Sequence, residues 1–146
     1  MSDDGLPPSQ LGARGRILIA DDDEPLRRML GAYLEDEGYL VHLAADGKQA
    51  LEAVPGFAPD LVLLDVTMPK LDGLEVARRL RATRGMARCN PRILMLSGLG
   101  DDAARSAGLG AGADAYATKP MRPGELVRRI EALLLRDAEG SEADPD

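Results

Sequence analysis

The chain has 146 residues and a mass of 15.5 kDa, a size typical of a single domain. Its 18 basic and 25 acidic residues give a formal charge of 18 − 25 = −7, which argues against a protein that binds nucleic-acid phosphates with a basic surface. A single cysteine, Cys89, and a single histidine, His42, exclude an internal disulfide and a structural zinc site built from Cys and His.

The two ends of the chain differ in composition from the middle. Residues 1–15 contain the tandem prolines Pro7 and Pro8 and no periodic apolar pattern, and residues 137–146 are acidic and rich in small side chains. We therefore expect a flexible extension over 1–15, one folded domain over 16–136 and an acidic tail over 137–146. No secretory signal follows the acidic start, and no strictly apolar run exceeds four residues, so we expect a cytoplasmic protein without membrane insertion.

The first half of the domain alternates between strand and helix patterns. Residues 17–20 form an uninterrupted apolar run, which is typical of a strand buried on both faces. From Leu26 to Leu34, apolar residues recur at the spacing of one helix face, with Asp23 as a helix N-cap and Gly38 as a stop. A second strand is predicted over residues 39–44, and a short helix over residues 48–54.

The second half repeats this alternation. The remaining elements are predicted, in order, as strand 61–64, helix 74–80, strand 93–96, helix 101–111, strand 113–118 and a last helix that opens at Pro123. Five strands that alternate with five helices predict a three-layer α/β/α sandwich around a parallel sheet.

Polar side chains stand at the carboxyl ends of four predicted strands, where ligands bind in an open parallel sheet. They are Asp21 and Asp22, then Asp65, Ser97 and Lys119. Crowded carboxylates repel one another unless a cation lies between them, and Mg²⁺ is a hard cation that accepts such oxygen ligands together with phosphate oxygens. An ammonium and a hydroxyl beside them suit a phosphoryl group, so an aspartate here is a credible phosphoryl acceptor.

These motifs, in this order, resemble the receiver domain of two-component response regulators. The resemblance spans Arg16 to about Arg136 and rests on Asp21-Asp22, Asp65-Val66-Thr67-Met68-Pro69, Lys70-Leu71-Asp72-Gly73, Ser97-Gly98 and Lys119-Pro120. It implies a flavodoxin-like fold with the strand order 2-1-3-4-5, as in chemotaxis response regulators.

The resemblance also implies a role for each matching residue. Asp65 would be the phosphoacceptor. The ligands of a Mg²⁺ cofactor would be Asp22, Asp65, the backbone carbonyl of Thr67 and, largely through water, Asp21. Lys119, Ser97, Gly98 and Tyr116 would form the phosphoryl-binding and switch positions, and the peptide before Pro120 would be cis. Asp23 does not match a ligand position of the family and is expected only to cap a helix.

A receiver domain of this kind would take its phosphoryl group from a histidine kinase or a histidine phosphotransfer protein. Ser97 and Tyr116 would then shift a two-state equilibrium in the face built from the fourth helix, fifth strand and last helix, which docks a downstream protein or a second copy of the chain. We expect no enzymatic activity beyond the chain's own phosphorylation and dephosphorylation, and no direct binding of nucleic acid. With only a short tail after Arg136, the chain is either a stand-alone regulator or a receiver cut from a longer one.

Two other functions compete with this interpretation. Phosphatases of the haloacid-dehalogenase type also use an aspartate nucleophile, but they usually carry a second Asp two residues later, where this chain has Thr67. A receiver-like interaction module that does not use phosphate is the other alternative. The intact acid pair of Asp21 and Asp22, together with Asp65, Ser97 and Lys119, argues against it.

Overall fold

The computed structural model describes residues 14–138 apart from residues 69, 83–89, 99 and 101. Strands and helices alternate along these residues, as the sequence predicts. The elements are β1 (Arg16–Ala20), α1 (Glu24–Asp36), β2 (Leu40–Ala44), α2 (Gly47–Phe57), β3 (Leu61–Asp65), α3 (Gly73–Ala82), β4 (Arg92–Ser97), α4 (Asp102–Gly110), β5 (Ala115–Thr118) and α5 (Pro123–Ala138).

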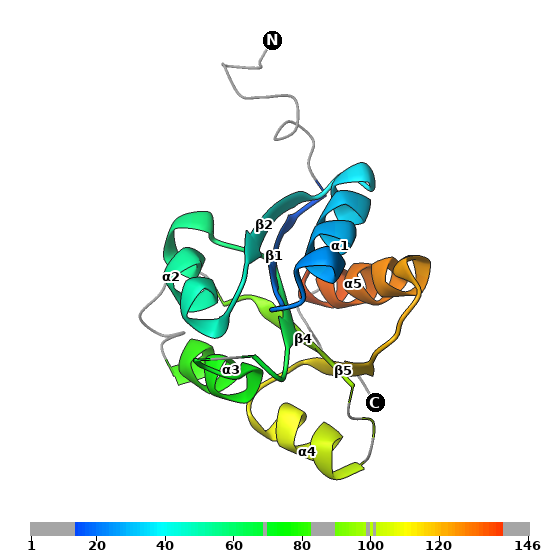
Figure 1. The fold of residues 1–146 in the computed structure, drawn as a ribbon. Helices are drawn as coiled ribbons and strands as arrows, with labels where there is room; N and C mark the ends of the chain where they lie inside the picture. The colour runs from blue at the N-terminus through cyan, green and yellow to red at the C-terminus, as the bar shows by residue number, and fades with distance from the viewer. Residues whose placement is uncertain (1–13, 69, 83–89, 99, 101, 139–146) are drawn as a thin grey trace.

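The strands form one parallel sheet in the order β2-β1-β3-β4-β5. Helices α1 and α5 cover one face of this sheet, and α2, α3 and α4 cover the other (Figure 1). The predicted three-layer sandwich and the strand order implied by the family resemblance are therefore confirmed. In such a sheet every strand points its carboxyl end to the same edge, which is where the polar strand ends meet.

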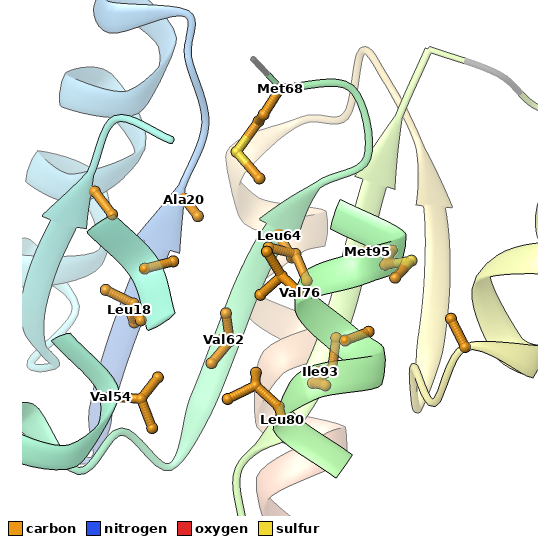
Figure 2. Packing of buried hydrophobic residues seen from close by; sticks show 14 of the residues in the cluster. Leu18, Ala20, Val54, Val62, Leu64, Met68, Val76, Leu80, Ile93 and Met95 are labelled. Carbon is orange, nitrogen blue, oxygen red and sulfur yellow. The ribbon is translucent and has the colours of Figure 1, made fainter. Parts of the chain in front are cut away.

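Both faces of the sheet are buried, which explains the uninterrupted apolar runs. Alternate residues of each central strand contact opposite helical layers: in β3, Val62 and Leu64 belong to the core beneath α2 and α3, and Leu61 and Leu63 to the core beneath α1 and α5. Figure 2 shows the first of these cores, with Val62 and Leu64 between side chains from β1, β4 and α3. The central strands thus form a rigid support for the residues at their ends.

The ends of α1 match the sequence prediction. Asp23 is the N-cap, since its Oδ1 accepts a hydrogen bond from the amide of Leu26 at 3.1 Å. Gly38 follows the helix with φ +102°, a conformation that favours glycine. Helix α1 therefore starts at a defined residue directly after the acidic end of β1.

Helix α2 is longer than the predicted span of residues 48–54, because it continues through Pro55 to Phe57. Proline disfavours helical backbone in the preceding residue, which is why the sequence pattern suggests an end at Val54. The extra residues are held by tertiary contacts: the Phe57 ring lies 5.3 Å from that of His42, and the Phe57 carbonyl accepts a hydrogen bond from Arg16 Nε at 2.7 Å. His42 itself is exposed.

The last strand and helix also differ from the predicted bounds by a few residues. β5 begins at Ala115 rather than residue 113, since Gly112 turns the chain with φ +118° and Asp114 forms ion pairs with Arg81 and Arg92. α5 ends at Ala138, so the first two residues of the predicted tail belong to the helix. Most of both predicted extensions, and Cys89, lie outside the described residues. Among the described residues, no helix has the length and apolar character needed to span a membrane.

Candidate functional site

Three carboxylates meet at the carboxyl edge of the sheet. Asp21 directly follows β1 and Asp65 ends β3, and these two strands are neighbours in the sheet. Asp21, Asp22 and Asp65 each offer an oxygen within 4.8 Å of the others. Asp21 and Asp65 are only 2% and 5% exposed, whereas Asp22 is exposed. The donors therefore form a small, half-open cluster of hard oxygen ligands, a set that fits a divalent cation such as Mg²⁺.

Lys119 reaches this cluster from the end of β5. Its Nζ lies 3.2 Å from Asp21 Oδ2 and 3.4 Å from Asp65 Oδ1. Its backbone amide donates to the Ser97 carbonyl at 2.7 Å, which anchors the residue beside β4. One ammonium offsets only part of the charge of three carboxylates. The cluster keeps a net negative charge that a metal ion would neutralise.

The surroundings change how the site titrates. Burial raises the pKa of Asp65 to about 6, and the Asp21 carboxylate adds to this rise, while Lys119 and the Thr67 amide oppose it. For Lys119, burial lowers the pKa, but the Asp21 and Asp65 carboxylates outweigh it, so its pKa is raised. Lys119 therefore remains a cation at neutral pH. The surroundings destabilise the ionised form of Asp65, and a neighbouring cation would reduce this effect.

The turn after β1 sets the direction of the acid pair. The amide of Asp23 donates to Asp21 Oδ1 at 2.9 Å, and Arg27 Nη1 donates to the Asp21 carbonyl at 2.6 Å. Asp23 uses its own carboxylate to cap α1. Asp23 thus lies next to the cluster and acts as a helix cap, as the sequence predicts.

The loop after β3 lies close against the acceptor position. The amide of Thr67 donates to Asp65 Oδ1 at 3.4 Å, and the amide of Gly73 donates to the Val66 carbonyl at 2.8 Å. A β-carbon at Gly73 would lie 2.4 Å from the Asp65 carbonyl oxygen, so only glycine allows α3 to start this close to β3. The loop thereby keeps Thr67 beside Asp65.

The remaining predicted site residues lie at the ends of β4 and β5. Ser97 is buried at the end of β4, between the ends of β3 and β5. Gly98 is exposed, and a β-carbon added there would meet no atom within 4 Å, so the edge of the site is open at this point. The Lys119–Pro120 peptide is cis.

Tyr116 lies within β5, beneath α4. Its ring is buried, and a β-carbon at Gly108 of α4 would come within 2.7 Å of that ring. The guanidinium of Arg105, also in α4, lies 5.6 Å from the ring centroid. Tyr116 therefore links β5, the strand that Lys119 follows, to α4.

Two contacts near the site were not predicted from the sequence. Arg27 is one of 15 arginines, and only the folded turn shows that it reaches the Asp21 carbonyl. Asp46, the N-cap of α2, is buried and pairs with Lys70 of the loop after β3 at 3.5 Å. A helix-cap pattern at Asp46 could have been found in the sequence, but its partner on a distant loop could not.

Comparison with known proteins agrees with this geometry. The family model described as "Response regulator receiver domain" matches residues 17–131. Response regulator MprA of Mycolicibacterium vanbaalenii is 47% identical over 121 residues, which cover 83% of this chain and 51% of that protein. The chain thus spans about half the length of the curated relatives it matches.

Solved structures give the same result. The receiver domain of Francisella response regulator 1452 matches with a TM-score of 0.78 and 32% identity, over 84% of this chain and 98% of that one. A chain in the CheX–CheY–BeF3–Mg²⁺ complex from Borrelia burgdorferi matches with a TM-score of 0.76 and 28% identity, over 84% and 91%. With its fold, its acidic strand ends and these matches, the chain belongs to the response regulator receiver domains of two-component signalling.

Proposed function

We propose that this chain is a phosphorylation-controlled switch in which Asp65 accepts a phosphoryl group from a histidine kinase or a histidine phosphotransfer protein, with Mg²⁺ as cofactor. The observation that carries the proposal is the carboxylate cluster of Asp21, Asp22 and Asp65, with Lys119 in contact with both buried acids. The similar structure from Borrelia burgdorferi contains, by its name, BeF3 and Mg²⁺, which supports the same chemistry here.

The residues of the cluster suit distinct tasks. Asp22, Asp65, the Thr67 carbonyl and, through water, Asp21 would hold Mg²⁺. The bound ion would neutralise charge on the carboxylates and on the phosphoryl oxygens. Ionised Asp65 would attack phosphorus, the P–N bond to the donor imidazole would break, and its electron pair would remain on that imidazole. Lys119, held between Asp21 and Asp65, would stay protonated and bind the transferred group.

Phosphorylation of Asp65 would then change the surface around β5 and α4. Ser97 would move toward the phosphoryl group, and Tyr116 would change its contacts beneath α4. The open space beside Gly98 would admit water or the donor protein to the site. We expect the face formed by α4, β5 and α5 to bind a downstream protein in the cytoplasm, or a second copy of the chain.

The proposal is tested by incubating the full chain with a small phosphodonor, with and without Mg²⁺, and measuring the intact mass. Wild type should gain the mass of one phosphoryl group only with Mg²⁺, and Asp65→Asn should gain none. Asp23→Asn is the matched control, because Asp23 is adjacent to the acid pair yet only caps α1. The proposal is wrong if Asp65→Asn is labelled as strongly as wild type.

A further inference from the structure

We propose that Arg27 of α1 is a positioning residue for metal binding, acting through the peptide that joins Asp21 to Asp22. This inference rests on the proposed function, because it concerns Mg²⁺ at the carboxylate cluster. Arg27 Nη1 donates to the Asp21 carbonyl at 2.6 Å, and the residue is half-buried. A guanidinium that donates to a carbonyl forms a charge-assisted hydrogen bond, which is stronger than a neutral one.

Other groups fix the remaining parts of this turn. The Asp21 amide donates to the Ala44 carbonyl at 3.2 Å, and the Asp21 carboxylate accepts the Asp23 amide and contacts Lys119. The Asp21 carbonyl is thus the remaining backbone group of Asp21, and Arg27 is its partner. Because that carbonyl belongs to the peptide leading to Asp22, the contact fixes the plane from which the Asp22 side chain departs.

Asp22 depends on this backbone more than the other two acids do. Asp21 and Asp65 are buried and in contact with Lys119, whereas the Asp22 carboxylate is exposed and contacts no partner within the described part of the chain. Within the described part of the chain, the backbone of the turn is therefore the main constraint on where its carboxylate can lie. A ligand whose direction is set in advance binds a cation better than one that must first be ordered.

Arg27 has two effects on a metal ion, and they are opposite in sign. Its positive charge near the cluster repels Mg²⁺, so a purely electrostatic role predicts tighter binding when the charge is removed. A positioning role predicts weaker binding. Loss of groups that orient metal ligands typically weakens metal affinity by about 10- to 100-fold, and we expect about tenfold for this half-buried contact. The sign of the change therefore separates the two roles.

The test is to measure the dissociation constant of Mg²⁺ by calorimetry for wild type, Arg27→Met, Arg27→Lys and Arg28→Met. Arg28 is the matched control. It is the next residue of α1, its side chain is 72% exposed, and it pairs with Glu24 at 3.3 Å. Arg27→Met should weaken Mg²⁺ binding about tenfold, Arg27→Lys should restore part of the loss, and Arg28→Met should stay within about twofold of wild type.

Thermal unfolding with a chelator present checks that Arg27→Met is folded when its affinity is measured. The inference is overturned if Arg27→Met binds Mg²⁺ as tightly as Arg28→Met does, or more tightly. Asp22→Asn distinguishes this result from failure of the proposed function. If wild type binds no Mg²⁺, or if Asp22→Asn binds it as tightly as wild type does, the proposed Mg²⁺ site and the role of Arg27 are both wrong. If Asp22→Asn loses Mg²⁺ binding and Arg27→Met does not, only the role of Arg27 is wrong.

Discussion

Asp65 combines two properties that a folded protein rarely gives one carboxylate. It is 5% exposed and lies beside the acidic side chain of Asp21, and these two features raise its pKa to about 6. Charge repulsion of this kind reduces the stability of the metal-free fold and favours any ligand that brings positive charge. Ionised Asp65 therefore destabilises the metal-free protein, and the same residue is the best candidate for the proposed phosphoacceptor.

This property predicts a pH-dependent difference between wild type and Asp65→Asn in the presence of a chelator. Because the folded pKa of about 6 lies above the unfolded value of 3.8, the folded state binds more protons than the unfolded state between these values. The stability that the protonated carboxyl contributes is fully present below the unfolded pKa and is lost as pH rises through the folded pKa. Ionised Asp65 then destabilises the fold by up to roughly 3 kcal/mol.

Urea unfolding at several pH values measures this effect. Asp65→Asn should gain stability relative to wild type as pH rises from about 4 to about 7, since the amide does not ionise. Lys119 keeps its contact with Asp21 in this variant, so the site retains one ion pair. A difference between the two proteins that does not change with pH would contradict the raised pKa.

Helix α3 begins so close to β3 that its first residue must be glycine. A β-carbon at Gly73 would lie 2.4 Å from the Asp65 carbonyl oxygen, whereas one at Gly56 of α2 would meet no atom within 4 Å. Both glycines belong to helices, but neighbouring backbone atoms leave no room for a side chain at Gly73, whereas the space beside Gly56 is open. They form a matched pair for testing whether the start of α3 supports the acceptor.

We expect Gly73→Ala to destabilise the protein by about 1–3 kcal/mol, because the backbone at Asp65 must move to make room. Gly56→Ala should instead stabilise it by up to about 1 kcal/mol, since alanine favours helical backbone. Urea unfolding of the two variants measures both changes. Equal effects of the two substitutions would show that the contact between Gly73 and Asp65 is not tight.

The elements differ in how well the sequence predicts them. The three apolar runs identified the central strands because both faces of those strands are buried, and Asp23 and Gly38 marked the ends of α1. Pro55 suggested too early an end for α2, since contacts of Phe57 with other elements outweigh the local effect of proline. Periodicity alone did not order the strands; that order came from the family resemblance.

The candidate site was predictable for a similar reason. Asp21, Asp65, Ser97 and Lys119 each stand at the end of a strand, so the topology brings them to one edge. Contacts made by side chains from helices or distant loops leave no such pattern. Arg27 on the Asp21 carbonyl is an example, because its position in α1 resembles that of any other polar helix residue.

The two edges of the sheet are charged in different ways. At the amino-terminal edge of β4, the Asp114 carboxylate pairs with Arg81 at 2.7 Å and Arg92 at 3.3 Å, and accepts the Ile93 amide at 2.8 Å. At the carboxyl edge, the carboxylates of Asp21, Asp22 and Asp65 lie together, and the ammonium of Lys119 contacts those of Asp21 and Asp65. The excess of negative charge at the carboxyl edge supports the proposal that a cation and a phosphoryl group bind there.

The proposed role of Asp65 is best tested by finding which side chain carries the phosphoryl group. The full chain is incubated with a small phosphodonor and Mg²⁺, treated with borohydride, which reduces an aspartyl phosphate to homoserine, then digested and analysed by mass spectrometry. We expect homoserine at position 65 with Mg²⁺ present, and an unmodified Asp65 when a chelator replaces the metal. Homoserine at position 21 or 22, or a phosphorylated chain with Asp65 unmodified, would contradict the account.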